Sequence, residues 1–367
     1  MSIGNRNGKI ELMRFIMSLF VIIYHAESTI NEDFYPRFFD IITLSKHGCM
    51  GVEFFFLLSG FFMAKSAEKE YNIKRNYVFN DSTNYVLKRY ITLLPPVIIS
   101  FFAVFTVNNL IKSHGLHETL YNLFKALPDM LLFSMTGVPY YKVNGLTWYL
   151  SSLIIGFIII YPFCRKFYKK FSKIFAPVIA LLLLTFLFTH NEPIRLSAVY
   201  KLYGFLRVAN IRAVCELLLG VCCYELSKKI GSINWSSASR KILTVIEFTL
   251  IVSLCCYIFS PLSEAWQYVF LFVAFAYIAI VLSGASLGNE IFNKKWINYL
   301  GKLSLNVYLI QYVGINIAKK FLISSHYIVF IIFSIVVSII LSVIIMPLSN
   351  KIVAFIVKLS KKYHLIY

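Results

Sequence analysis

The chain has 367 residues, of which 59% are hydrophobic and only 14% are charged, and its formal net charge is +19. Soluble globular domains have an apolar share of about 45 to 50%, so this composition excludes them and predicts an all-α, polytopic membrane protein. The positive charge does not indicate a nucleic-acid partner, because its distribution along the chain follows membrane sidedness.

Hydrophobic stretches long enough to cross about 30 Å of hydrocarbon predict about ten membrane-spanning helices. They are residues 12–30, 49–64, 91–111, 146–163, 174–190, 211–227, 242–260, 266–284, 303–322 and 327–348. Lysine and arginine residues are concentrated on the side of the N-terminus, so both termini are expected to be cytoplasmic. We therefore expect a multi-pass protein of the plasma or inner membrane. Its membrane domain would be residues 1–348, followed by a basic amphipathic tail, residues 349–367.

The first predicted span contains two ionisable side chains, Arg14 and His25, at a depth where charges are rare and usually functional. Eleven residues at about 100° each come within roughly 20° of three full turns, so both side chains lie on one helix face. The rise between them is about 16 Å. This face carries a permanent cation near one end and a titratable base further along, which favours a long, partly anionic ligand.

The second predicted span contains Glu53, and a carboxylate at this depth needs a partner. In the predicted topology Glu53 and His25 both lie in the outer halves of their spans. Glu53 is therefore a candidate to orient His25 as a general base and to stabilise its imidazolium form. The alternative is a protonated Glu53 that bonds to backbone or hydroxyl groups. Ser59 and Gly60 are interpreted as packing residues that let helices approach closely.

The third predicted span begins with Lys88 and Arg89 at the cytoplasmic membrane face. Both side chains could be ordinary anchors whose charged ends reach the interface. Together with Arg14, at a similar depth, they could instead bind phosphate groups through charge-assisted hydrogen bonds. Pro95 and Pro96 are expected to bend or unwind the helix just inside the bilayer and could open a cavity there.

The segment 117–135 is predicted to be a surface or re-entrant helix interrupted by Pro128. Trp148 and Tyr149 follow at the outer end of the fourth span, where an aromatic belt is the ordinary explanation. They could also stack against an acceptor sugar, and Asn144 just before them offers a polar group to the same acceptor.

Metal binding is not expected. His114 and His117 form a short HxxH pattern, but no further histidine, cysteine or carboxylate cluster completes a site. The seven cysteines are an odd number, lie mostly within predicted spans and lack paired metal-ligand spacing, so they are interpreted as small packing residues.

These blocks together resemble the acyltransferase-3 family of integral membrane O-acyltransferases, which modify surface glycans and other extracytoplasmic acceptors with acyl groups from acyl-CoA. The similarity is to the surface-polysaccharide O-acetyltransferase type without a fused esterase-like domain. The Arg/His pair combined with the FFLLSGF block is the most specific part. The matching blocks are Arg14 with His25, GVEFFFLLSGF (51–61), KRYITLLPP (88–96), LTWYLSSLIIG (146–156), ELLLG (216–220) and LGKLSLNVYLIQ (300–311).

The resemblance implies a role for several residues. His25 would be the essential catalytic histidine, and Arg14 would help to bind acyl-CoA. Arg89 would match the first of two arginines that the family carries near the third span, but Thr92 stands where the second is usual. Binding of the cofactor would then shift toward Lys88 or be weaker.

Two further positions depart from the family pattern. Leu153 stands where many members have a glutamate after the tryptophan motif, and Gln311 replaces a frequent histidine. The similarity is therefore to the members with a WYL-type motif.

The predicted function is transfer of an acetyl or other short acyl group from cytoplasmic acyl-CoA to a hydroxyl of an extracytoplasmic or lipid-linked glycan. The donor phosphates would rest on Arg14, Lys88 and Arg89. The pantetheine arm is comparable in length to the rise from Arg14 to His25, so the thioester would arrive near the histidine. The alternative hypothesis is a transporter or flippase for a lipid-linked saccharide or small anion, with Arg14, His25 and Glu53 along its path.

Overall fold

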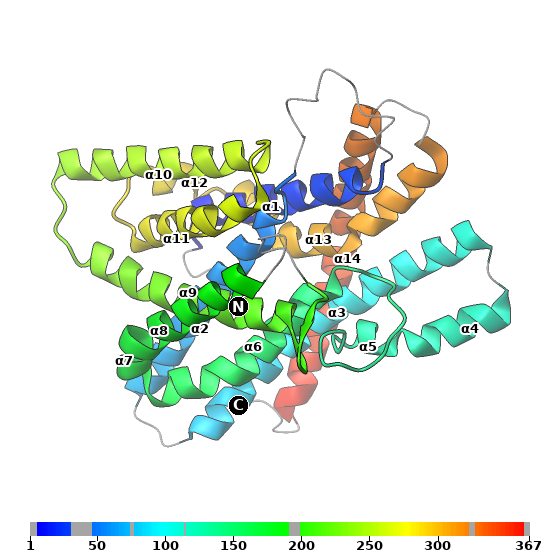
Figure 1. The fold of residues 1–367 in the computed structure, drawn as a ribbon, viewed down its shortest axis with the longest axis horizontal. Coiled ribbons are helices and arrows are strands. Elements are labelled where there is room, and N and C mark those ends of the chain that lie inside the picture. The colour runs from blue at the N-terminus through cyan, green and yellow to red at the C-terminus, as the bar shows by residue number, and fades with distance from the viewer. Residues whose placement is uncertain are drawn as a thin grey trace.

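The hydrophobic segments form long helices in a computed structural model that describes residues 6–30, 46–73, 77–113, 115–190, 199–322 and 327–362. Figure 1 shows these helices assembled into one bundle, with a small β-hairpin and short helices in the connections. The first half contains α1 (Gly8–Glu27), α2 (Met50–Asn72), α3 (Val78–Lys112), α4 (Leu116–Lys125), α5 (Leu127–Met130), α6 (Thr147–Lys166), α7 (Tyr168–Lys170) and a π-helical turn (Phe171–Phe175) that continues into α8 (Ala176–His190). The second half contains β1 (Leu202–Tyr203), β2 (Leu206–Arg207), α9 (Val208–Gly231), α10 (Ser237–Ile258), a 3-10 turn (Glu264–Trp266), α11 (Gln267–Ser283), α12 (Asn289–Phe292), α13 (Lys295–Leu322) and α14 (Tyr327–Lys362).

Each of the ten predicted spans coincides largely with one long helix. Among the described residues, seven helical segments are long and apolar enough to cross a membrane. These are α2, α3, α6, the run from α7 to α8, α10, α11 with its preceding 3-10 turn, and α14. The other three long helices, α1, α9 and α13, carry several of the polar and ionisable residues of the candidate site, among them Arg14, Arg212 and Gln311. The prediction of an all-helical, polytopic membrane protein is confirmed.

The segment 117–135 forms short helices and not a span. α4 ends before Pro128, and α5 begins one residue ahead of it, so the predicted interruption is confirmed. The side chains of Leu116, Leu120 and Phe124 repeat every four residues along α4 and are exposed. Such an apolar face suits a helix that lies in the membrane interface.

The C-terminal part of the chain continues the last helix. α14 runs through Pro347 to Lys362, and residues 363–367 lie outside the described part of the chain. The division between a membrane domain and a basic tail at residue 348 stays a prediction.

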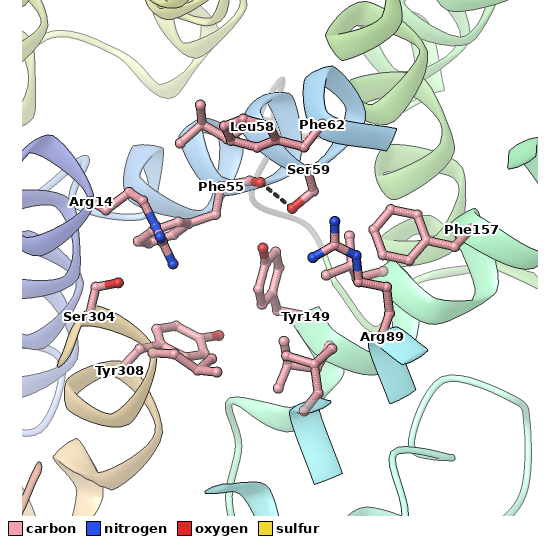
Figure 2. Close-up of a pocket in the computed structure, with 14 residues that line it drawn as sticks. Arg14, Phe55, Leu58, Ser59, Phe62, Arg89, Tyr149, Phe157, Ser304 and Tyr308 are labelled. Carbon is pink, nitrogen blue, oxygen red and sulfur yellow. Dashed lines mark hydrogen bonds between the residues drawn. The ribbon is translucent and has the colours of Figure 1, made fainter. Parts of the chain in front are cut away.

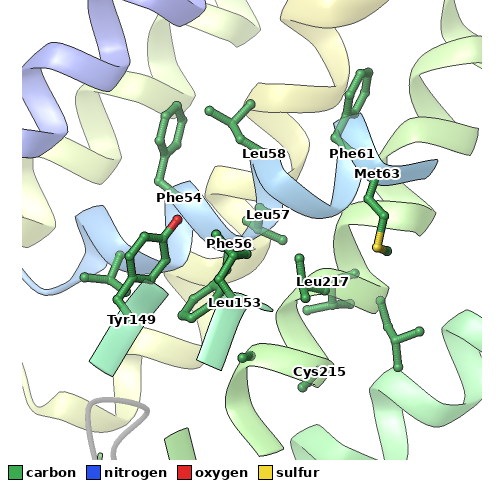
Figure 3. Close-up of a cluster of buried hydrophobic side chains, with 14 of the residues drawn as sticks. Phe54, Phe56, Leu57, Leu58, Phe61, Met63, Tyr149, Leu153, Cys215 and Leu217 are labelled. Carbon is green, nitrogen blue, oxygen red and sulfur yellow. The ribbon is translucent and has the colours of Figure 1, made fainter. Parts of the chain in front are cut away.

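The core of the bundle surrounds α2. Phe54, Phe56 and Leu57 are fully buried, and α2 packs against α1, α6, α9 and α11. Figure 3 shows these side chains meeting residues of α6 and α9. Because a helix that is apolar on most of its surface must be buried on most sides, α2 takes the central position and its neighbours form the walls of the site.

The closest approach in this core is between α2 and α9, at Gly60 and Gly220. A Cβ on Gly60 would lie 2.2 Å from the carbonyl oxygen of Leu217, and one on Gly220 would lie 2.4 Å from the carbonyl oxygen of Leu57. Both neighbours are backbone atoms that cannot rotate aside. The interpretation of Gly60 as a residue that lets helices approach closely is confirmed.

We expect Gly220→Val to destabilise the folded protein by about 1–3 kcal/mol, because the two helices must separate to admit the side chain. The measurement is the thermal unfolding midpoint of the purified protein in detergent, followed by intrinsic tryptophan fluorescence. Gly115→Ala is the matched control, since Gly115 has an ordinary φ of −67° and nothing within 4 Å of the added Cβ. An unfolding midpoint for Gly220→Val equal to that of the parent would contradict this packing.

Candidate active site

Arg14 of α1 lines a cavity of about 200 Å³ whose walls also come from α2, α3, α6 and α13. Arg89 reaches into the same cavity from α3. Figure 2 shows the two guanidinium groups on either side of the space, with the hydroxyl end of Tyr149 between them. Further hydroxyl groups come from Ser59, Ser304 and Tyr308. The site therefore joins residues far apart in sequence, and it lies beside the proline-containing part of α3.

The cavity is suited to an anion. Its described lining residues include two arginines and no carboxylate, and apolar side chains such as Leu153 and Phe157 form much of the wall. Glu11 lies 3.3 Å from the guanidinium of Arg14, but Arg6 contacts the same carboxylate oxygen at the same distance. One shared carboxylate leaves the site with an excess of positive charge. Two guanidinium groups in such a place can bind phosphate oxygens through bidentate, charge-assisted hydrogen bonds.

The predicted cation cluster forms in part. Arg14 and Arg89 face one cavity, whereas Lys88 is exposed on α3 and is not among the described residues that line it. Thr92 donates a hydrogen bond to the backbone carbonyl of Lys88. The contribution of Lys88 to ligand binding stays a prediction.

His25 lies in the last turn of α1, half-buried between the rings of Tyr24 and Tyr312. Its Nδ1 is 3.2 Å from Oε1 of Gln311, while Nε2 of Gln311 donates to the carbonyl oxygen of Tyr308 at 2.7 Å. Since the amide oxygen of Gln311 can only accept, Nδ1 of His25 must carry the proton. The neutral imidazole then keeps Nε2 as its basic nitrogen, which is the state that a general base requires.

The cavity and His25 are connected through α1 and α13. Arg14 and His25 lie on the same face of α1, about 16 Å apart along its axis. On α13, Tyr308 lines the cavity and Gln311 contacts His25, so about one helical turn, or roughly 5 Å, separates the two places. A ligand whose phosphates lie between Arg14 and Arg89 thus needs a narrow extension to reach the histidine. Measured from Arg14, that extension is about 16 Å long.

Glu53 has a different partner from the one predicted. Its carboxylate is fully buried and accepts a hydrogen bond from Nη2 of Arg212, in α9, and not from His25. Nε of Arg212 also donates to Glu216, at 3.0 Å. The predicted pairing of Glu53 with His25 is corrected. A buried carboxylate gains most from a permanent cation, and the tight crossing of α2 and α9 places that cation beside it.

The three charged groups form a buried ion triad with one cation and two carboxylates. The guanidinium of Arg212 also lies 5.3 Å from the centre of the Trp148 ring, which joins α6 to the pair of α2 and α9. Among the described residues, Oε2 of Glu53 and Oε2 of Glu216 have no hydrogen-bond partner. The triad therefore depends strongly on Arg212. The signal for it is in the sequence, since Arg212 and Glu216 are four residues apart in a predicted span and provide the opposite charge that Glu53 needs.

The three residues predicted to contact the acceptor, Trp148, Tyr149 and Asn144, are buried inside the bundle. Trp148 is buried against the ion triad, and Tyr149 lines the cavity that holds the two arginines. Asn144 is fully buried, donates to the carbonyl of Leu309 and accepts from the amide of Leu146, which favours a structural role. Acceptor binding by these three residues stays a prediction.

No metal centre is visible in the described part of the chain, where no group of three or more histidine, cysteine or acidic residues lies close enough to hold an ion. His114, one half of the HxxH pattern, lies outside the described residues.

A family model described as an acyltransferase domain matches residues 7–347. The match extends from the start of α1 into α14, so it includes every helix that surrounds the cavity and the ion triad. No curated protein and no solved structure matches the chain.

Proposed function

The chain belongs to the acyltransferase-3 family of integral membrane O-acyltransferases, and from this premise we propose the reaction that it catalyses. An acetyl or other short acyl group passes from cytoplasmic acyl-CoA to a hydroxyl of an extracytoplasmic or lipid-linked glycan. The observation that supports this most is the placement of one cavity, with Arg14 and Arg89 facing into it, along the helix whose last turn carries His25.

The cavity has the features that an acyl-CoA requires. The phosphates of CoA meet Arg14 and Arg89, and the pantetheine arm follows the apolar wall toward Tyr308 and His25. Leu153 belongs to that wall, at a position where many family members have a glutamate. In this chain the phosphate site therefore lacks the negative charge of that glutamate. The distribution of basic residues along the sequence favours an orientation with the arginines toward the cytoplasm and His25 toward the outside.

The proposed chemistry needs one base beside the thioester. The acceptor hydroxyl attacks the thioester carbonyl carbon, a C–O bond forms and the C–S bond breaks. Nε2 of His25 accepts the hydroxyl proton and passes it to the departing thiolate, so the products are an O-acyl glycan and the free thiol of CoA. Transient attachment of the acyl group to Nε2 would give the same products in two steps.

The alternative hypothesis, a transporter for a lipid-linked saccharide or small anion, places the same charged residues along a permeation path. It predicts movement of the substrate without covalent change. Membership in a family of O-acyltransferases favours group transfer.

We expect Arg14→Ala and Arg89→Ala each to weaken acetyl-CoA binding by about tenfold or more, since each removes a charge-assisted phosphate contact. The measurement compares binding of acetyl-CoA with that of S-acetylpantetheine, which has no phosphate, to the purified protein. The parent should prefer acetyl-CoA, and each variant should lose much of that preference. Lys173→Ala, at an exposed position in the π-helical turn, is the control. An unchanged preference in both arginine variants would contradict the assignment of the donor site.

Gln311 gives a separate prediction about the pH dependence. In Gln311→Glu, a carboxylate replaces the amide oxygen beside Nδ1 of His25 and stabilises the imidazolium form. The base is then protonated up to a higher pH, so the acidic limb of the rate–pH profile should move to higher pH while activity at alkaline pH is retained. In Gln311→Met, kcat should fall by roughly tenfold with little change in KM for acetyl-CoA, because the ring loses its fixed tautomer. Profiles of both variants that overlay the parent profile would contradict this role.

A further inference from the structure

A second set of polar side chains lies near His25, in the connections that lead into α6 and α9. The ammonium of Lys142 acts electrostatically on His25 and lies 4.9 Å from the centre of the Tyr200 ring. A Cβ on Gly145 would lie 2.7 Å from Cε of Lys142 and 3.6 Å from the ring of Tyr312. Lys142 and Tyr312 therefore pack over the same glycine. The ring centres of Tyr312 and His25 are 5.6 Å apart, so this glycine lies close to the histidine.

A second cation lies in the same group. Arg207 ends the hairpin of β1 and β2 and immediately precedes α9, and its charge reaches the phenol groups of Tyr140 and Tyr200. Nε of Arg207 is buried and has no hydrogen-bond partner among the described residues. A buried guanidinium donor without an acceptor is costly, and an anionic ligand would satisfy it.

The acid that acts on Lys142 is already hydrogen-bonded to other groups. Asp129 of α5 acts electrostatically on Lys142, but its oxygens accept hydrogen bonds from the amides of Val143 and Asn144 and from the hydroxyl of Thr147. Asp129 thus fixes the backbone on the C-terminal side of Lys142.

Neither Lys142 nor Arg207 forms an ion pair within the described part of the chain. Desolvation lowers the pKa of Lys142, and a bound anion would offset that cost. Basic residues are disfavoured on the outer side of a membrane protein, so an exposed lysine and a half-buried arginine close to a reactive histidine call for a ligand.

We propose that Lys142 and Arg207 bind an anionic group of the acceptor, and that the acceptor is therefore an acidic saccharide whose hydroxyl is presented to His25. The rings of Tyr140, Tyr200 and Tyr312 form the apolar surface on which a sugar ring can stack. This inference rests on the proposed function and names the substrate class of the same site. The anion is a carboxylate of a sugar acid or a phosphate of a glycan or its lipid carrier, since both offer oxygens to guanidinium and ammonium groups.

The test uses the full-length protein in nanodiscs with acetyl-CoA labelled in the acetyl group. The acceptor probe is a membrane glycan fraction from cells that lack this gene, separated by anion exchange into acidic and neutral pools. We expect label to enter the acidic pool. In Lys142→Gln and Arg207→Gln, the KM for that pool should rise about tenfold or more, with kcat and the KM for acetyl-CoA little changed. Lys201→Gln is the control, because Lys201 lies on the same hairpin but stacks on Tyr203 and bonds to the carbonyl of His190.

Two treated samples of the acidic pool identify the anion. Reduction of its carboxyl groups to alcohols removes acceptor activity if the anion is a sugar carboxylate, and dephosphorylation with hydrofluoric acid removes it if the anion is a phosphate. Label in the neutral pool alone, or parental KM values in both variants, would overturn the inference while leaving acyl transfer established. Absence of label from both pools would overturn the proposed function, and this inference with it.

Discussion

Replacing His25 with alanine is expected to lower kcat for acyl transfer by about a hundredfold to ten-thousandfold, which is the usual contribution of a positioned general base. The variant loses the nitrogen that accepts the hydroxyl proton, but it keeps the cavity between Arg14 and Arg89, which His25 does not line. Acetyl-CoA binding should therefore stay within about twofold of the parent. The measurement is release of free CoA thiol in the presence of a membrane glycan fraction.

Two controls separate catalysis from folding in this experiment. His190→Ala removes an exposed histidine near the end of α8 and should leave the rate unchanged. The unfolding midpoint of His25→Ala should remain close to that of the parent, because the ring is half-buried and has one side-chain hydrogen bond. A fully active His25→Ala protein would exclude His25 as the base and would leave the aromatic residues around it without a catalytic purpose.

Replacing Arg212 with methionine should destabilise the fold by about 3–5 kcal/mol, because it leaves two carboxylates buried without their cation. Glu53 and Glu216 are both fully buried, and both depend on this guanidinium. The measurement is unfolding of the purified protein in mixed micelles by increasing amounts of a denaturing detergent. The variant should unfold at a markedly lower denaturant fraction than the parent.

A compensating variant tests whether charge is the cause. Arg212→Met combined with Glu53→Gln and Glu216→Gln removes all three charges, and it should recover much of the lost stability. Lys9 provides a second buried ion pair for comparison, since it contacts Glu247 at 2.8 Å. If the triple variant is no more stable than Arg212→Met alone, loss of packing and not unpaired charge explains the effect.

Hydropathy can be followed residue by residue along the chain, so the structural features that depend on it can be predicted from the sequence. The helices, the break before Pro128 and the common face of Arg14 and His25 all follow from runs and periods of residues along the chain. The role of Gly60 also follows locally, because a glycine within an apolar span indicates a close helix crossing.

Contacts between helices were harder to predict, since many arrangements of the same spans are compatible with one hydropathy profile. Depth alone pairs Glu53 with His25, but in the bundle Arg212 of α9 is the residue that contacts the carboxylate. The sequence marks Gln311 only as a departure from a family pattern, whereas its hydrogen bond to His25 gives it a role in orienting the ring. Depth in the membrane restricts the possible partners of a charge, but the choice among them depends on which helices touch.

The central claim is that the acyl group of a CoA thioester bound between Arg14 and Arg89 passes to a glycan hydroxyl at His25. The most direct measurement reconstitutes the parent and His25→Ala in nanodiscs, adds acetyl-CoA labelled in the acetyl group, and counts label in a glycan fraction from cells that lack this gene. We predict glycan-dependent label with one equivalent of CoA thiol released per acetyl group in the parent, and background label in the variant. Tight binding of acetyl-CoA by the parent without transfer of label to any glycan would contradict the account.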